Sequence, residues 1–156
     1  LFGEQLAVVA SPWLLKSMPA IREPADVAQF TLIEVGDAHR MPYFQSITWR
    51  RWLEIHNLER LQPRRWLYFN YAQQIAQAAL AGQGLALARM PLVAPSLASG
   101  DLIEVLPGHR LDSPLAYWLV VGPRGGLRPE VQAFCAWLRL QAQATRRATG
   151  EESAVS

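Results

Sequence analysis

Few side chains in this sequence have the chemistry of a metal ligand or a nucleophile, and they are scattered. His39, His56 and His109 lie in three separate segments, and none has a cysteine or an acidic residue at a metal-ligand spacing. Cys135, the single cysteine, falls on the apolar stripe of a predicted helix, which indicates a buried core thiol. We therefore expect no metal, no cofactor and no enzymatic activity in this chain.

Two glycine-containing stretches have only a superficial likeness to phosphate-binding loops. A dinucleotide fingerprint follows a strand and opens a helix, whereas Gly82 and Gly84 close a predicted helix and open a strand. Residues 122–126 lie between a strand and a helix but lack the glycine spacing of that motif. The first pair is predicted to form a helix cap and a turn.

Asn70 is the residue whose position best fits ligand binding. It ends a predicted strand and directly precedes a predicted helix, so its side chain can cap that helix. The free N–H groups of the first helical turn would then point toward the carboxyl end of the strand, where open parallel sheets bind ligands. Small carboxylates suit such a position because the helix dipole also favours an anion. The alternative is that Asn70 caps its own helix and binds nothing, and the residues alone leave both interpretations open.

The elements that must position these residues follow from hydrophobic periodicity and from turn residues. Strands are predicted at 5–10, 30–35, 65–70, 85–89, 102–106 and 115–121. Helices are predicted at 13–17, 24–29, 47–56, 72–81, 92–98 and 129–147. The polar segment 36–46 is predicted to be a loop, and 112–114 a break. Because strands alternate with helices, we expect an α/β fold with a largely parallel sheet.

Tryptophans on helix faces are predicted to belong to the core. Trp49 and Trp52 share one face of the helix at 47–56, and Trp137 lies on the helix at 129–147. Trp66, on the strand at 65–70, fits the core and the ligand site equally well. The last helix also carries one apolar stripe that is expected to pack against a core, formed by Val131, Phe134, Cys135 and Leu138.

The overall composition is that of a folded domain with little charge bias. The chain has 156 residues, 51% of them hydrophobic and 18% charged, which suffices for a buried core. Its net charge is +2, too balanced for a strong electrostatic binder of nucleic acid. With one cysteine and no apolar run of the roughly 18 residues that span a bilayer, the chain is predicted to be cytoplasmic.

Seven segments occur along the chain in an order that is specific when taken together: 6–12, 24–27, 78–87, 91–93, 100–102, 117–121 and 128–134. The most specific is 78–87, Ala-Ala-Leu-Ala-Gly-Gln-Gly-Leu-Ala-Leu. Together they resemble the C-terminal part of LysR-type transcription regulators, especially the subgroup similar to the glycine-cleavage activator. The resemblance covers residues 1 to about 144.

This resemblance implies an effector domain similar to periplasmic binding proteins of type 2. Two α/β lobes, joined by two crossover strands, would hold a small molecule between them. Residues 1–10 would form the first crossover from the first lobe, 11–112 the complete second lobe, and 113–148 the return strand and a helix of the first lobe. Residues 149–156 would be a disordered tail. The helix-turn-helix and most of the first lobe of such regulators have no counterpart in these residues.

The resemblance also implies a site and partners. Phe69, Asn70 and Tyr71 would face the cleft, while Ser11 and Tyr117 would line the cleft or the hinge. The partners would be a small effector such as a carboxylate or an amino acid, and further copies of the chain in a dimer or tetramer. DNA would be contacted only through an N-terminal helix-turn-helix, and no membrane is implied. A periplasmic-type solute-binding receptor shares this architecture and is the alternative function.

Overall fold

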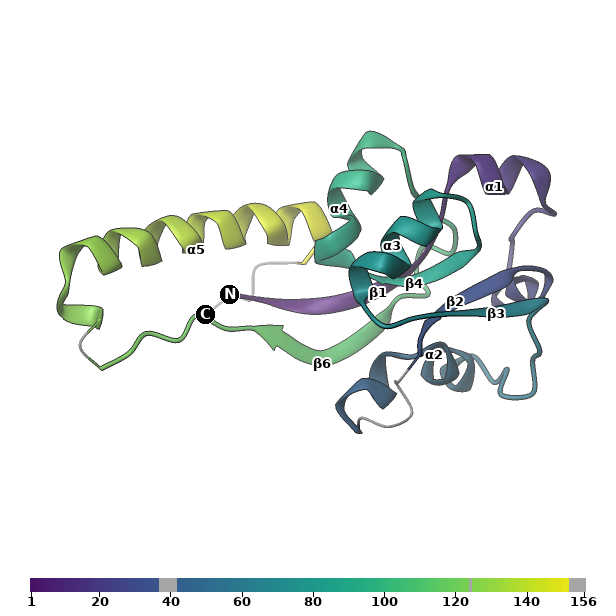
Figure 1. Ribbon diagram of the computed structural model, residues 1–156, viewed down its shortest axis with the longest axis horizontal. Coiled ribbons are helices and arrows are strands. Elements are labelled where there is room, and N and C mark those ends of the chain that lie inside the picture. Colours follow the sequence, from purple (N-terminus) through teal and green to yellow (C-terminus); the bar gives the residue numbers. More distant parts are fainter. Residues whose placement is uncertain (37–41, 124, 152–156) are drawn as a thin grey trace.

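The computed structural model describes residues 1–36, 42–123 and 125–151, and a mixed six-stranded sheet organises them (Figure 1). The strands are β1 (Phe2–Ala10), β2 (Thr31–Val35), β3 (Arg65–Phe69), β4 (Leu85–Arg89), β5 (Ile103–Glu104) and β6 (Leu111–Tyr117). Their order across the sheet is β3-β2-β4-β1-β5, and β6 also pairs with β1. The α/β class and most predicted strand positions are therefore confirmed.

The expectation of a largely parallel sheet is wrong for half of it. β2 is parallel to β3 and β4, but β1 is antiparallel to β4, β5 and β6. A parallel connection needs a helix that carries the chain back along the sheet. The two helices between β1 and β2 have six residues each, and β2 begins at the edge of the sheet where β1 ends.

Helices cover both faces of the sheet (Figure 1). They are α1 (Pro12–Ser17), η1 (Pro24–Gln29), η2 (Pro42–Ile47), α2 (Trp49–Ile55), α3 (Ala72–Leu80), α4 (Met90–Ser99), η3 (Gly125–Leu127) and α5 (Pro129–Thr149), where η denotes a 3-10 helix. Part of the predicted loop at 36–46 is thus helical, since η2 occupies 42–47, and 37–41 lie outside the described residues. Ser11 caps α1 by accepting a hydrogen bond from the N–H of Leu14.

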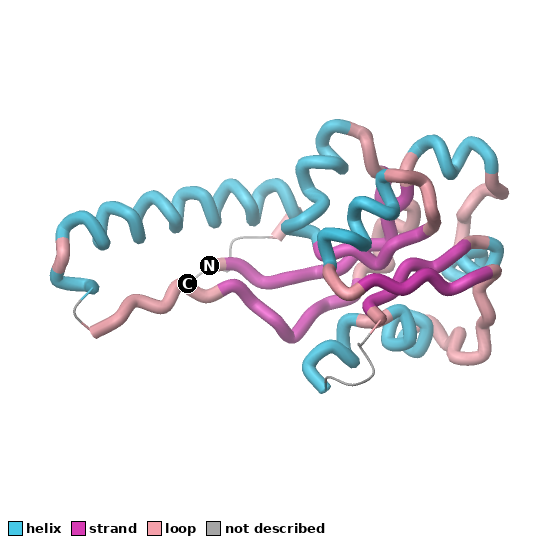
Figure 2. Tube along the Cα trace, in the orientation of Figure 1, coloured by secondary structure: helices cyan, strands magenta, loops and turns pink. Residues whose placement is uncertain are grey.

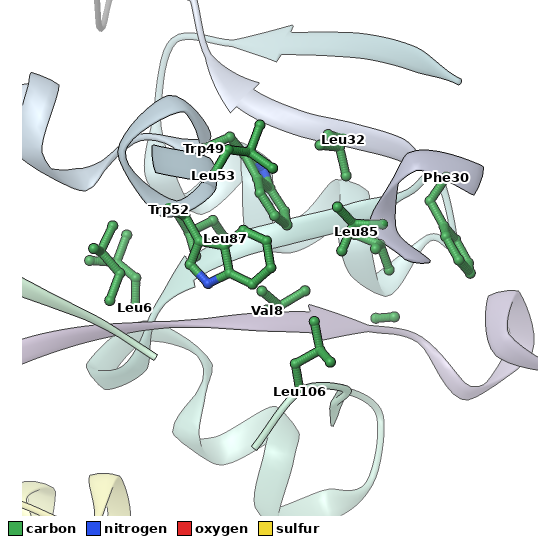
Figure 3. Packing of buried hydrophobic residues seen from close by; sticks show 13 residues of the cluster. Leu6, Val8, Phe30, Leu32, Trp49, Trp52, Leu53, Leu85, Leu87 and Leu106 are labelled. Atoms are coloured by element: carbon green, nitrogen blue, oxygen red, sulfur yellow. The ribbon is translucent and has the colours of Figure 1, made fainter. Parts of the chain in front are cut away.

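The strand pleat divides the core into two layers. Leu6, Val8 and Ala10 of β1 face the layer that contains Trp49 and Trp52 of α2 (Figure 3). The intervening residues of β1 belong to the second layer, with the buried faces of α3 and α4. Both tryptophans are fully buried, as predicted, and their rings meet edge to face at 5.3 Å between centroids.

The return strand lies earlier in the chain than predicted. β6 begins at Leu111 and includes Pro114, which the sequence analysis treated as a strand break. Proline lacks an N–H donor but is tolerated on an edge strand, and the pairing recorded for β6 is with β1 alone. Residues 118–121, predicted as strand, have no regular structure, and Trp118 and Val120 are largely exposed.

The long helix α5 leaves much of its apolar surface exposed. Figure 2 shows that most of this helix lies apart from the helices that flank the sheet, and that its C-terminal end reaches α4. Phe134 and Trp137 are 56% and 53% exposed, so Trp137 is not a core residue within the described part of the chain, and only Cys135 of the predicted stripe is buried. Thr149, expected to begin a disordered tail, is instead the buried last residue of α5, and 152–156 lie outside the described residues.

The turn from α3 to β4 yields a stability prediction. A Cβ on Gly84 would lie 2.4 Å from the backbone oxygen of Thr31, so the strand would have to move. We expect Gly84→Ala to lower the free energy of unfolding by about 1–3 kcal/mol, measured by urea unfolding with tryptophan fluorescence. Gly122→Ala is the control, because its Cβ would meet no heavy atom within 4 Å. Equal stability of the two variants would contradict this account of the turn.

Candidate functional site

A pocket of about 460 Å³ lies where the parallel strands β2, β3 and β4 end. Its lining residues come from the middle of β1, these strand ends, η2 and the first turn of α3: Leu6, Glu34, Val35, Phe44, Ile47, Asn70, Tyr71, Ala72, Ile75, Leu87, Ala88 and Arg89. The pocket is therefore at the sheet edge that the sequence analysis selected. Its size suits a small molecule.

Asn70 and Tyr71 line the pocket, but the predicted capping role of Asn70 is wrong. Tyr71 occupies the N-cap position of α3, and no side chain makes a capping hydrogen bond there. Asn70 lies one residue before the N-cap position of α3, and its side chain is exposed. Its Oδ1 is 3.4 Å from the position that a Cβ on Gly36 would take. The backbone oxygen of Tyr71 accepts hydrogen bonds from the N–H groups of Gln74 and Ile75. The preceding amides of the first turn are ones that a helix cannot pair internally, so they are donors for a ligand.

The other three predicted site residues do not line this pocket. Ser11 follows the end of β1, which pairs with the start of β4, so it lies at the opposite edge of the sheet, buried as the cap of α1. Phe69 packs its side chain into the second core layer, while its backbone oxygen accepts a hydrogen bond from the N–H of Gly36. Tyr117 pairs with Phe2, the first residue of β1, and is connected to the pocket only through other residues.

The residues that connect Tyr117 with the pocket are Glu4 and Arg89, which form a buried ion pair. The side chain of Glu4 is completely buried, and its Oε1 accepts a 2.5 Å hydrogen bond from Nε of Arg89, at the pocket wall. The hydroxyls of Tyr117 and Ser113 donate to the same carboxylate at 3.2 and 3.1 Å. Burial raises the pKa of Tyr117 above its ordinary value, which keeps the hydroxyl protonated as a donor. Glu4 thus fixes one edge of the Arg89 guanidinium.

Glu34 places a second buried carboxyl group at the pocket. Its two oxygens accept hydrogen bonds from the N–H groups of Trp49 and Val35, at 2.9 and 3.0 Å. Burial raises its pKa from 4.5 to about 7, and the two hydrogen bonds from backbone N–H groups oppose that rise. The Trp49 N–H belongs to the first turn of α2, so Glu34 ties β2 to the start of that helix.

The pocket therefore combines donors for an anion with a carboxyl group that titrates near neutrality. Arg89 and the start of α3 are suited to a carboxylate, and Glu34 to an ammonium or hydroxyl group. Glu4, Glu34 and Arg89 were not among the site residues predicted from the sequence. The available signal was an acidic residue inside or next to an apolar strand, because a buried carboxylate requires hydrogen-bond partners and is often functional.

These features together define a class of protein. A lobe with parallel strands ending at a small-molecule pocket, crossed by a long antiparallel strand pair that leads out of the lobe, is a ligand-binding α/β lobe. Residues 1–143 match the family described as the LysR substrate binding domain. The chain belongs to this family, and the resemblance noted in the sequence is confirmed.

Curated relatives place the chain near one group of regulators. It is 29% identical over 144 residues to the glycine cleavage system transcriptional activator of Escherichia coli strain K12, covering 92% of this chain and 44% of the relative. The homolog of that activator in Haemophilus influenzae is 29% identical over 135 residues, covering 86% and 42%. The chain thus spans less than half the length of these relatives.

Solved structures agree on the fold. The effector domain of the transcriptional regulator AmpR of Pseudomonas aeruginosa has a TM-score of 0.68 and 26% sequence identity, covering 94% of this chain and 66% of that chain. The AmpR effector binding domain from Citrobacter freundii has a TM-score of 0.57 at 19% identity, covering 88% and 63%. The predicted effector-domain fold is therefore confirmed. Among the described residues, none of the helices is both long and apolar enough to cross a membrane.

The raised pKa of Glu34 predicts a specific dependence of stability on pH. The native state binds this proton more tightly than the unfolded chain, so stability from this group is present below pH 4.5 and is lost as the pH rises to about 7. The loss is on the order of 3 kcal/mol. Glu34→Gln removes this titration. The free energy of unfolding of the unsubstituted chain, relative to that of the Glu34→Gln variant, should therefore fall between pH 5 and pH 8. Urea unfolding at both pH values measures this, and a constant difference between the two proteins would refute it.

Proposed function

We propose that the chain is the effector-sensing domain of a bacterial LysR-type transcription regulator, which binds its effector in the pocket at the ends of β2, β3 and β4. The observation that carries the proposal is this pocket, walled by Arg89, Glu34 and the first turn of α3. Family membership supports the sensing role. The names of the relatives, a transcriptional activator and a transcriptional regulator, support the control of transcription.

The effector that fits this chemistry is a small carboxylate or an amino acid. A carboxylate would lie between the amides at the start of α3 and the terminal nitrogens of the Arg89 guanidinium, whose Nε is held by Glu4. An ammonium group on the same molecule would be drawn to the Glu34 carboxylate. Asn70, with its amide at the pocket, would add a hydrogen bond.

We further propose that the segments of the chain have the structural roles implied by the family. Residues 1–10 and the strand β6 serve as the two crossovers, the segment between them forms the second lobe, and α5 packs on a first lobe. The exposed apolar side chains of α5, Phe134, Trp137 and Leu140, support this packing. The return crossover is better placed from Leu111 than from 113, because β6 begins there. An effector bound between the lobes would shift their relative orientation.

In the whole protein, this shift would change how a dimer or tetramer presents its DNA-binding heads. The domain itself would be non-enzymatic and cytoplasmic, and it would leave DNA contact to a helix-turn-helix. Its net charge of +2 supports that assignment, because a nearly balanced charge gives little net electrostatic attraction to the phosphates of DNA.

A thermal-shift screen followed by one substitution tests the pocket. Amino acids and small carboxylates are screened against the chain, because a ligand of the native state raises the unfolding temperature. Asn70→Ala should weaken binding of the strongest hit by about tenfold, the usual effect of losing a hydrogen bond to a charged group. Since Asn70 is exposed and does not cap α3, its loss should change stability by less than about 0.5 kcal/mol.

Gln77→Ala is the matched control, because Gln77 is exposed on α3 but does not line the pocket. Its affinity for the same ligand, measured by calorimetry, should equal that of the unsubstituted chain. If Asn70→Ala binds the ligand unchanged, or if both variants lose it equally, the proposed location is wrong.

A further inference from the structure

The charges at the effector pocket distinguish between the two ligand classes that suit its size and donors. Among the described residues that line it, Arg89 and Glu34 are the charged side chains. The buried Glu4 carboxylate already balances the charge of Arg89 through their ion pair. When Glu34 is ionised, the three groups carry one net negative charge, and an anionic ligand would add another in a partly buried place. The charge balance therefore favours a ligand without net charge.

Glu34 and Arg89 lie on the same face of the sheet, on neighbouring strands. β2 and β4 pair in parallel, with Ile33 beside Ala86. One step further along, Glu34 comes beside Leu87, and Arg89 follows two residues later on β4. With strands about 4.8 Å apart and a rise of about 3.3 Å per residue, the Cα atoms of Glu34 and Arg89 are about 8 Å apart. One small molecule can therefore contact both side chains.

These two side chains have hydrogen-bond partners other than each other. The Glu34 carboxyl group accepts from backbone N–H groups, and Nε of Arg89 donates to Glu4. In the described part of the chain, no ion pair joins Glu34 to Arg89, and the terminal nitrogens of Arg89 donate no hydrogen bond. A carboxylate oxygen that accepts one hydrogen bond can accept another. The pocket thus offers both an acceptor and a charged donor to a ligand.

The rest of the pocket wall is mainly apolar. Leu6 and Leu87 belong to the core layer beneath α2, while Val35 and Ile75 belong to the layer beneath α3. Ile47 of η2 lines the same pocket. A ligand that contacted only the charged groups would leave this surface facing water, whereas an apolar group on the ligand would cover it.

We propose that the effector of this pocket is an α-amino acid with an apolar side chain. Its carboxylate binds the terminal nitrogens of Arg89 and the amides at the start of α3, and its ammonium group binds Glu34. Its side chain lies against the apolar wall. The inference rests on the proposed function, because it specifies the ligand of the same pocket. A simple carboxylate would satisfy Arg89 but would bring its negative charge toward Glu34 with no cation between them.

The ionisation of Glu34 links ligand binding to pH. Burial raises the pKa of Glu34 to about 7, so about half of the population is protonated at neutral pH. An ammonium group beside Glu34 favours the ionised form and lowers its pKa, so binding of the amino acid releases a proton. Affinity for the amino acid therefore rises with pH. Within the described residues, the other titratable and charged groups that share a cavity wall with Glu34 are Arg50, Glu54, Glu59, Tyr68, Tyr71 and Arg89.

The test compares three probes whose charged groups differ. L-leucine carries both charged groups, 4-methylpentanoate lacks the ammonium group, and 3-methylbutylamine lacks the carboxylate. By calorimetry at pH 8, leucine should bind at least about tenfold more tightly than either of the others, the usual effect of a hydrogen bond to a charged group. Leucine affinity should fall about tenfold from pH 8 to pH 5.5. At pH 7, leucine binding should release a fraction of a proton, measured in two buffers with different ionisation enthalpies.

Glu34→Gln keeps the size of the side chain and removes its charge. In this variant, leucine should bind about as weakly as 4-methylpentanoate binds the unsubstituted chain, and its affinity should no longer depend on pH. Glu59→Gln is the matched control, because Glu59 is exposed and lines a neighbouring cavity but not this pocket. Its leucine affinity and pH dependence should equal those of the unsubstituted chain. Unfolding curves establish that both variants are folded.

Equal or tighter binding of 4-methylpentanoate at pH 8 would overturn the inference and leave the location of the pocket standing. Absence of leucine binding, or leucine affinity that Glu34→Gln leaves unchanged, would also overturn it. A carboxylate that stabilises the chain and is weakened by Asn70→Ala would then support the proposed function without this inference.

Discussion

The fold depends on β1, a strand that is buried on both faces and hydrogen-bonded on both edges. Its residues from Leu6 to Ala10 are all buried, and they alternate between the two core layers. β1 pairs antiparallel with β4 on one side and with β5 and β6 on the other. Because its direction opposes that of β4, the middle of β1, at Leu6, lies beside the end of β4, at the sheet edge where the parallel strands end. That edge holds the pocket.

The same strand places charge at that edge. Glu4 precedes the apolar run of β1, and its buried carboxylate is acceptable only because Arg89 and two hydroxyl groups satisfy it. The same ion pair also positions Arg89, because Glu4 holds its guanidinium at the pocket wall. Glu34 on β2 is also a buried carboxyl group, and its hydrogen-bond partners are backbone N–H groups. Structural satisfaction of two buried acids and the electrostatics of the pocket therefore have a common origin.

Local features of the fold were predictable from the sequence, and long-range ones were not. Ser11 before a proline predicts a helix cap, and the spacing of Trp49 and Trp52 predicts a buried helix face, since both signals lie within a few residues. The direction of β1 and the start of β6 depend on pairing between strands that are distant in the sequence. The hydrophobic periodicity of a single segment carries no information about such pairing. The exposure of Trp137 could not be predicted, because helical spacing shows which residues share a face but not whether another element covers that face.

The candidate site was predictable only in its location. Strand-to-helix order predicts a pocket near Asn70, but not the lining residues contributed by β1, β2 and β4. Ser11 and Tyr117 were selected by family resemblance, and the strand directions place Ser11 at the opposite edge.

Amide chemical-shift mapping tests the central claim most directly. ¹H–¹⁵N spectra would be recorded while the chain is titrated with the amino acid or carboxylate that stabilises it most. The account predicts the largest shifts at the start of α3, from Tyr71 to Ile75, and at the ends of β2 and β4, around Val35 and Arg89. Shifts concentrated at the opposite sheet edge, around Ser11 and α1, would contradict it.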